Sequence, residues 1–491
     1  MILTDEQKKK LLQDYNVWEE NEKTGERKVR QQNLAELIFN ELDHHFITTP
    51  DGTIYTYNGG YYEENGEQII KNTTETFLEE FTTEHLKKEI VGYIRDKNYQ
   101  KPEVFNSDPD LLNIKNGIYN IKTNELIPHT HEKYFLSQIP ITYNKDAQIT
   151  AIKKFFEEVL RPEDIQLVQE VFGYIFLRKY PIQKAFMLLG DGANGKSVTL
   201  SLLKTFVGIE NTCAISLQDI AKSRFVMATL HKKMANIYPD VTDEAIHKTG
   251  LFKALTGGDM ITAERKFKEP FNFLNYAKFI FSANKLPEVH DDSDAFFRRW
   301  IFVTFPNKFE GNKADKNLIE KLTTEEEISG LFNWSVEGLK RLLATGDFTN
   351  TKTTDEMRDT YQRLASPIKA YVDDCLIISA SDYIEKDEMY NSFCGYCNKN
   401  NLPVVAKNTF SMRLHEYVRV EDHRPSVNGK RIRAWMGVRF KTDSDKNEDV
   451  QDVQDVHPFP LLKCKGVEDY DIILDNVKHL DNMDRLDGEE V

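Results

Sequence analysis

The chain has 491 residues, 40% of them hydrophobic and 29% charged, which is enough for several domains with buried cores. Its 64 Lys and Arg residues against 79 Asp and Glu residues give a net charge of -15, which excludes a global basic field for nucleic acid or an anionic membrane. Five cysteines and no charged-then-apolar leader at Met1 argue against a disulfide-built secreted protein. Apolar runs fall far short of the roughly 18 residues of a membrane-spanning helix, so we expect a cytoplasmic protein with no membrane partner.

The first part of the chain combines helices with short strands. Thr4 followed by acidic residues predicts a helix start, and β-branched and aromatic residues then alternate between a PDG and an NGG turn. Strand-like pieces resume in residues 111–143, and helical spacing returns in residues 151–180. We expect an N-terminal α+β region over residues 1–100 and a separate small domain over residues 101–180.

Strands and helices alternate from Lys184 to about Pro306, which predicts an α/β fold with helices on the faces of a sheet. The strand candidates are AFMLL, MANIY, AKFIF and WIFVTF. We expect this core over residues 181–310 and a helical lid or connector over residues 311–365.

The most specific motif is GDGANGKS, which begins at Gly190 and is a full G-x-x-x-x-G-K-[ST] match. AFMLL runs into it and the helical pattern VTLSLLKTF runs out of it, so the loop lies where a strand end meets a helix N-terminus. Glycines let backbone N–H groups surround phosphate oxygens, the lysine reaches the β and γ phosphates, and the serine hydroxyl can bind Mg²⁺. We therefore predict ATP and Mg²⁺ as cofactors. The predicted nucleotide-binding residues are Gly190, Asp191, Gly192, Ala193, Asn194, Gly195, Lys196, Ser197 and Val198, and Lys196 is also a predicted catalytic residue.

Acidic residues follow the second candidate strand: Asp240 ends KKMANIYPD, and Asp243 and Glu244 stand just beyond it. A carboxylate at a strand end opposite a phosphate loop holds Mg²⁺ through water, and a neighbouring carboxylate can orient the attacking water. We predict Asp240 as a metal residue together with Ser197. The catalytic base is open among Asp240, Asp243 and Glu244, because Pro239 disturbs the usual strand end and the last two acids could instead cap a helix EAIHKTG.

Two further elements of the core carry candidate catalytic residues. KFIFSAN ends in Asn284, whose amide can hold an attacking water by hydrogen bonds without titrating. Arg298 and Arg299 stand side by side before WIFVTF, a pattern typical of an arginine finger offered to the nucleotide of a neighbouring subunit. A surface salt bridge is the alternative role for these arginines.

Between two strand-like segments, AERKFKEP concentrates Arg265, Lys266 and Lys268 around Phe267. Such a hairpin tip offers three cations to a phosphate backbone and one ring for base stacking, on a protein that is otherwise acidic. We predict that these four residues bind DNA. A solvated hairpin with ordinary lysines is the alternative.

Residues 366–440 indicate three helices followed by VNGKRIRAWMGVRF, whose Asn-Gly turn predicts a hairpin, and this is the order of a winged-helix domain. Residues 407–440 hold 8 Lys and Arg against 3 acids, which reverses the charge of the chain. A winged helix places its last helix in the major groove and its wing on phosphates; protein contact is the alternative. The predicted DNA-binding residues here are Lys407, Arg413, Lys430, Arg431 and Arg433. Residues 441–491, with 15 acids and 6 bases, predict a disordered acidic tail.

The order GDGANGKS, ANIYPD, LTGGDMITAERKFKEPFNF, KFIFSANKLP, DAFFRRW resembles the superfamily three helicase core of the phage, plasmid and poxvirus-type primase-helicases. LTGGD followed by a basic, aromatic strand and EPF is its most specific part, and the likeness is strong over residues 105–310. LLNIKNGIYNIKTNELIPHT is similar to the domain that precedes the helicase core in this family. The resemblance implies an AAA+-like ring ATPase, usually hexameric, that translocates on single-stranded DNA, in most such helicases in the 3' to 5' direction.

Larger members of that family carry a primase domain with metal-binding acidic motifs ahead of the helicase, and residues 1–100 contain no spaced acidic pair of that kind. We therefore expect an ATP hydrolase and helicase without primase activity. It would act as a homo-oligomer on single-stranded and forked DNA of a viral or plasmid replicon, in a prokaryotic or virus-infected cell, with a separate primase and polymerase. The alternative is a DNA-binding replication initiator or regulator. Nucleotide binding would switch its assembly, and it would unwind little DNA.

Overall fold

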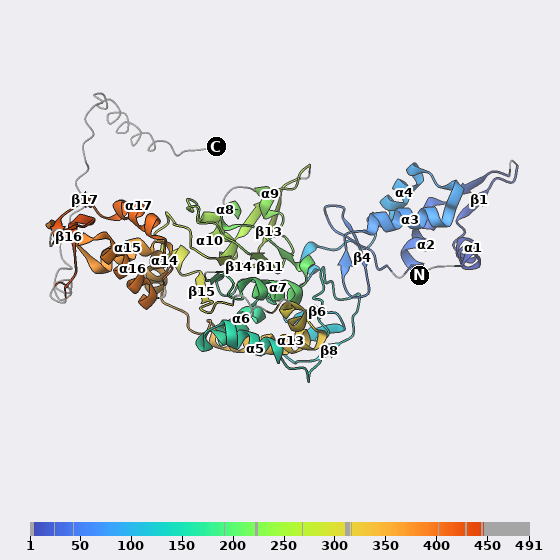
Figure 1. The fold of residues 1–491 in the computed structure, drawn as a ribbon. Coiled ribbons are helices and arrows are strands. Elements are labelled where there is room, and N and C mark those ends of the chain that lie inside the picture. Colours follow the sequence, from blue (N-terminus) through green and yellow to red (C-terminus); the bar gives the residue numbers. More distant parts are fainter. Residues whose placement is uncertain are drawn as a thin grey trace, which may run out of the picture.

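The computed structural model describes residues 4–442 and 445, with gaps at 24, 43, 191, 221–223, 268, 310–314, 316, 401 and 428–429. Residues 446–491, most of the predicted acidic tail, lie outside the described residues. Three large hydrophobic clusters follow one another along the chain, within residues 12–94, 112–365 and 368–438. Figure 1 shows the corresponding parts side by side, with the 112–365 part in the middle. That part joins side chains from the predicted segments 101–180, 181–310 and 311–365 in one core.

The N-terminal part consists of helices and short antiparallel strands. Its first helix begins as predicted: Gln7 N donates to the Thr4 hydroxyl at 3.3 Å and Thr4 N donates to the Gln7 side chain at 2.9 Å, which is a capping box. The two predicted turns join a three-stranded sheet of order β3-β4-β5. The elements are α1 (Asp5–Asp14), β1 (Trp18–Glu20), β2 (Arg27–Val29), α2 (Gln31–Glu41), β3 (Ile47–Thr48), β4 (Ile54–Tyr57), β5 (Tyr62–Glu63), α3 (Gly66–Leu78) and α4 (Glu84–Arg95).

A five-stranded parallel sheet forms the centre of the molecule, with order β10-β11-β14-β9-β15. Every residue of β9 and β14 is buried, which explains the unbroken apolar sequence of β9 and the central apolar run FIF of β14. The four strand candidates are confirmed, whereas the two-residue edge strand β10 was missed because it is too short for a pattern. The elements are β9 (Ala185–Leu189), α7 (Lys196–Val207), β10 (Thr212–Cys213), α8 (Leu217–Ile220), α9 (Arg224–Met227), β11 (Ala235–Tyr238), α10 (Gly250–Gly257), β12 (Met260–Ala263), β13 (Phe271–Leu274), β14 (Lys278–Ala283), α11 (Asp294–Phe297) and β15 (Trp300–Thr304).

The possible helix EAIHKTG is absent: residues 241–249 are irregular, and α10 begins only at Gly250. Ile246 instead forms an isolated bridge with Val289, and its backbone N–H donates to Glu288 O at 2.8 Å. This tertiary hydrogen bond uses a donor that a helix would need internally.

Helices from the segments before and after the sheet in the sequence cover one face of the sheet. Helix α13 packs along α6 (Figure 1), and a glycine in each helix lets the backbones meet. A Cβ on Gly173 would lie 2.3 Å from Ser335 O, and a Cβ on Gly338 would lie 2.6 Å from Gln169 O. The elements of this layer are β6 (Leu111–Ile114), β7 (Gly117–Asn120), β8 (Leu126–Ile127), α5 (Ala151–Val159), α6 (Ile165–Tyr174), α12 (Leu318–Leu322) and α13 (Glu325–Thr345), whereas α14 (Thr354–Ala365) packs on α11 and on the first helix of the C-terminal part.

The C-terminal part has the order helix, strand, helix, helix and then antiparallel strands, with a sheet of order β16-β20-β17. The expected first helix ends at Cys375, and the following residues pair with β20 as a strand that the sequence analysis missed. Ile377 and Ile378 are β-branched and favour a strand over the predicted helix. The elements are α15 (Pro367–Cys375), β16 (Leu376–Glu385), α16 (Lys386–Asn400), α17 (Lys407–Tyr417), β17 (Glu421–His423), β18 (Ser426–Val427), β19 (Lys430–Arg431) and β20 (Ala434–Phe440).

Candidate functional site

The phosphate loop joins the carboxyl end of β9 to the start of α7, as predicted. Gly190 has a φ of +155° and Gly195 has a φ of +96°, conformations that side chains rarely adopt. There is also no room for a side chain at either position. A Cβ would lie 2.8 Å from Phe305 O at Gly190 and 2.7 Å from Val159 Cγ1 at Gly195. Both glycines are therefore required by the fold itself. Asp191, a predicted loop residue, lies outside the described residues.

Neutral oxygens hold the loop lysine. Lys196 is 5% exposed, and its Nζ donates to Gly190 O, to Asn194 Oδ1 at 3.3 Å and to Asn284 Oδ1 at 3.0 Å. Asn284 follows β14, the strand beside β9, so two predicted catalytic residues meet at neighbouring strand ends. These three oxygens are neutral, and together they place Lys196 Nζ between the loop and the end of β14.

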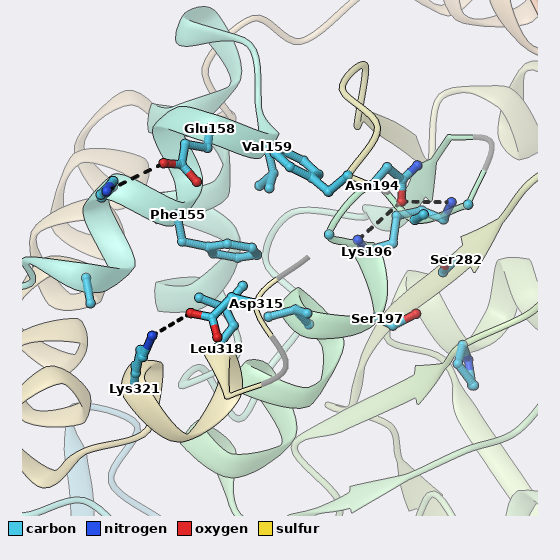
Figure 2. Close-up of a pocket in the computed structure, with 18 of the residues that line it drawn as sticks. Phe155, Glu158, Val159, Asn194, Lys196, Ser197, Ser282, Asp315, Leu318 and Lys321 are labelled. Atoms are coloured by element: carbon cyan, nitrogen blue, oxygen red, sulfur yellow. Dashed lines mark hydrogen bonds and ion pairs between the residues drawn. The ribbon is translucent and has the colours of Figure 1, made fainter. Parts of the chain in front are cut away.

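A cavity of about 770 Å³ opens at this end of the sheet (Figure 2). It contains most of the predicted nucleotide-binding residues together with Asp240 and Asn284. The lining residues are Ala151, Lys154, Phe155, Glu158, Val159, Gly192, Ala193, Asn194, Gly195, Lys196, Ser197, Val198, Pro239, Asp240, Ser282, Asn284, Phe309, Asp315, Leu318 and Lys321. Its size suits a nucleotide.

One wall of the cavity was missed by the sequence analysis. Phe155 and Val159 of α5 and Leu318 of α12 lie opposite Lys196 and Ser197 (Figure 2). These apolar side chains extend the cavity away from the phosphate loop, where a base could be covered. No motif marks them, since they come from segments about 40 residues before and 120 residues after the loop.

Helix α5 is fixed in place by a carboxylate from α13. Glu327 accepts hydrogen bonds from the backbone N–H groups of Thr150 at 3.0 Å, Ala151 at 2.8 Å and Ile152 at 3.0 Å. These are donors at a helix start that lack partners within the helix, and the negative charge complements the helix dipole. The cap aligns α5 against the phosphate loop and so shapes the missed wall.

The three candidate acids are separated. Asp240 follows β11, is exposed and lines the cavity, whereas Asp243 and Glu244 are absent from its lining. Asp243 instead forms an ion pair with Lys285 at 3.4 Å. Of the predicted residues, Asp240 and Ser197 both line the cavity, and a set of one carboxylate, one hydroxyl, phosphate oxygens and waters suits Mg²⁺. No group of three or more His, Cys, Asp or Glu side chains within the described residues could hold a metal without a nucleotide.

The two adjacent arginines differ. Arg299 is 5% exposed, and it donates to the Thr256 hydroxyl at 2.8 Å, to Lys253 O at 3.1 Å and to Ala295 O. Burial, together with the nearby charge of Arg298, lowers the pKa of Arg299. Arg298 is exposed and donates to the Gln183 side chain at 2.9 Å. The prediction of a paired finger therefore needs correction: Arg299 is bound within its own chain, and only Arg298 is presented outward.

The predicted basic hairpin exists, and β12 and β13 pair antiparallel from Met260 to Leu274. Lys266 is exposed, and Phe267 at the tip is 104% exposed. Arg265 turns back towards the stem, where its guanidinium lies 4.9 Å from the Phe271 ring centre and contacts His231 Nδ1 at 3.3 Å. Burial, with the charges of Lys232 and Arg265, lowers the pKa of His231 to about 4. The fourth predicted residue, Lys268, lies outside the described residues.

In the C-terminal part, two predicted DNA-binding cations have acidic partners. Lys407 forms an ion pair with Asp387, and Arg413 forms one with Glu288 of the central part at 2.7 Å. Burial alone would lower the pKa of Arg413, but hydrogen bonds to Glu288 and Glu416 outweigh it and raise that pKa. In this structure carboxylates therefore hold both cations, and their predicted contact with DNA stays a prediction. Arg431 and Arg433 are exposed, whereas the side chain of Lys430 lies outside the described residues.

Comparison with known sequences gives two family matches. Residues 5–161 match the family described as D5 N terminal like, and residues 188–299 match a family of unknown function, DUF5906. The second match runs from the end of β9 to just before β15 and includes the phosphate loop, Asn284 and the hairpin.

The chain is also similar to viral proteins named as putative helicases. It is 32% identical over 133 residues to putative helicase L207/L206 of Acanthamoeba polyphaga mimivirus, a match that covers 25% of this chain and 14% of that protein. It is 21% identical over 417 residues to putative helicase 121R of Invertebrate iridescent virus 3, which covers 75% of this chain and 43% of that protein. The chain thus spans less than half the length of these relatives.

Among solved structures, the apo NrS-1 C terminal region (305-718) covers 84% of this chain at 13% identity and a TM-score of 0.43. This score is too low for the likeness to carry an argument. In the part of the chain that the structure describes, helices are too short or too polar to cross a membrane.

Proposed function

We propose that the protein is an ATP-dependent DNA helicase of the superfamily three type, which serves the replication of a viral or plasmid-type replicon. The observation that carries the proposal is the contact between Lys196 and Asn284 at neighbouring strand ends, beside a cavity of about 770 Å³. The similarity to viral putative helicases supports the same class of activity. The strand order, with β9 between β14 and β15, agrees with the AAA+-like core that the resemblance implies.

In the proposed reaction, this chain's residues position a nucleoside triphosphate and a water. Backbone N–H groups of the loop and Lys196 bind the phosphates, and Ser197 with Asp240 would hold Mg²⁺, which would neutralise phosphate charge. Because the Asn284 oxygen accepts from Lys196, its NH₂ group is the end that can orient an attacking water. Asp240 is the candidate base that the cavity favours over Asp243 and Glu244.

Movement along DNA would use the β12–β13 hairpin. Lys266 offers charge to the phosphate backbone and Phe267 offers a ring for stacking at the exposed tip. In a ring of subunits, six by the resemblance, Arg298 would reach the neighbour's nucleotide. Single-strand translocation in the 3' to 5' direction, the absence of primase activity and the use of a separate primase and polymerase all rest on the resemblance.

A second candidate function is that of a DNA-binding initiator whose state is switched by nucleotide binding. The observation in its favour is the ion pair between Arg413 and Glu288, because Glu288 lies four residues after Asn284. A contact there links the C-terminal part to the nucleotide site without requiring translocation.

Strand displacement on forked DNA with a 3' or a 5' tail, in ATP and Mg²⁺, tests the proposal. Wild type should unwind from the 3' tail, and Lys196→Ala should not, since the loop loses its phosphate-binding charge. Lys204→Ala is the matched control, because this lysine stands on the same helix outside the cavity. ATP hydrolysis that depends on Lys196 without displacement on either fork would favour the initiator instead.

A further inference from the structure

Four arginines of the C-terminal part remain after its paired cations are set aside. Arg419, Arg424, Arg431 and Arg433 are all exposed. Within the described residues their side chains form no hydrogen bond and no ion pair, in contrast to Lys407 and Arg413, although the charge of Arg424 contributes to the lowered pKa of nearby Asp422. Four exposed arginines in one small part of a chain with net charge -15 indicate a local site for an anion.

The hairpin register places three of these arginines on one face. His423 pairs with Ala434, Ser426 pairs with Arg431, and the N–H of Ile432 donates to Pro425 O at 3.1 Å. Arg424 therefore lies opposite Arg433. Since side chains alternate between the two faces of a strand, Arg431 shares the face of this pair. Like charges directly opposite one another are destabilising, and a bound polyanion would remove that cost.

The arginine face continues onto α17. Trp435 of β20, two residues after Arg433, packs edge to face against His415 of α17 with ring centres 5.0 Å apart. The outer side of α17 carries Asn408, Met412 and His415, at helical spacings of four and three, and all three are exposed. Met412 is 70% exposed, so its side chain is accessible to a ligand on this side of the helix.

We propose that this combined surface, α17's outer side and the four arginines, binds duplex DNA. The helix side would enter the major groove, where Asn408 can bond base edges and Met412 can contact a thymine methyl, while the arginines bind phosphates. A protein partner would not need cations that face one another across the hairpin. The inference rests on the proposed function only in choosing DNA as the polyanion.

The same structure removes Arg413 and Lys407 from the duplex-binding surface. Arg413 holds Glu288 on the loop after Asn284, and Glu288 lies on the central part rather than on the C-terminal part. The surface can therefore contact a duplex while Arg413 keeps α17 docked beside the nucleotide site.

Duplex binding by the full chain, without nucleotide, tests the proposal. Fluorescence anisotropy with a labelled duplex of about 25 base pairs should be measured over a range of salt. Arg424→Gln with Arg433→Gln should weaken binding about tenfold or more and lower the slope of log K against log salt by about 2, one for each lost phosphate contact. Melting temperatures would check that both variants fold.

The matched control, Lys407→Gln with Arg413→Gln, removes the same charge from the same part and should change affinity less than about twofold. Equal weakening in both double variants, or no weakening in the Arg424 and Arg433 variant, would overturn the proposal. So would weakening seen only with single-stranded DNA. Because no hydrolysis is involved, failure here is distinct from failure of the helicase proposal in the Lys196→Ala test.

Discussion

The nucleotide site and the C-terminal part both hold cations that the sequence marks as functional, but their partners differ in charge. Lys196 is held by a carbonyl and two amide oxygens, and Arg265 by a histidine and a phenyl ring. Lys407 and Arg413 are held by carboxylates. A neutral oxygen or ring positions a cation, whereas a carboxylate also offsets its charge. The side chains around a cation therefore bear on its role as much as the cation itself.

The strongest way to break this comparison is to place a carboxylate beside Lys196 in the position of the Asn284 amide. In Asn284→Asp a carboxylate replaces the amide 3.0 Å from Lys196 Nζ and also repels the phosphates. We expect the rate of Mg-ATP hydrolysis to fall by about 100-fold or more. Asn400→Asp adds the same charge on an exposed helix of the C-terminal part and should leave the rate unchanged. A rate for Asn284→Asp within about threefold of wild type would contradict the account.

The adjacent arginines test whether neutral partners can also serve structure alone. Arg299→Ala leaves a hydroxyl and two carbonyls without their donor in the core, and should lower the free energy of unfolding by about 2–3 kcal/mol. Arg298→Ala, at an exposed position, should change it by less than about 0.5 kcal/mol. Denaturant unfolding of both variants measures the difference.

The Arg298→Ala variant should nevertheless lose ATP hydrolysis, because the guanidinium of Arg298 is the one presented to a neighbouring subunit. Mixing it with Lys196→Ala subunits should restore part of the activity, since one intact loop then faces one intact arginine. No recovery in the mixture would contradict the finger role. Similar loss of stability in both arginine variants would contradict the distinction between them.

Features built from residues that are close together in the sequence could be predicted, whereas features built from distant residues could not. The phosphate loop was predictable because glycines, strand and helix are consecutive residues. The cavity wall from Phe155 and Leu318 was not, because packing across distant segments leaves no motif. The partners of Arg413 and Arg299 likewise come from tertiary contacts, 125 and more than 40 residues away. Adjacent letters in DAFFRRW gave no means to distinguish a buried arginine from an exposed one.

A pH titration sharpens the comparison at the hairpin. His231 accepts a contact from Arg265 only while neutral, and its pKa of about 4 lies below the unfolded value of about 6.5. Its contribution to stability is therefore complete above about pH 6.5 and is lost as the pH falls towards 4. Between pH 7.5 and pH 5 wild type should lose about 2 kcal/mol more than His231→Gln. Equal losses in unfolding experiments at the two pH values would contradict a neutral His231.

The smallest expected effect concerns a carboxylate-held cation. The side chains of Arg413 and Glu288 are 24% and 48% exposed, so water and salt weaken their attraction. A double-mutant cycle with Arg413→Gln and Glu288→Gln should give a coupling of about 0.5–1 kcal/mol in unfolding at low salt, and less in about 1 M salt. Additive effects of the two substitutions would show that the ion pair does not hold α17 on the central part.

The central claim is that hydrolysis at the Lys196 site drives a DNA strand through contacts of the exposed hairpin tip. It is tested most directly by strand displacement and ATP hydrolysis measured together for Lys266→Ala with Phe267→Ala. Thr262→Ala with Asn272→Ala is the control, because it changes exposed residues of the hairpin stem and keeps the tip. The account predicts that the tip variant hydrolyses ATP at close to the wild-type basal rate but displaces no strand, while the stem variant does both. Displacement at the wild-type rate by the tip variant would contradict it.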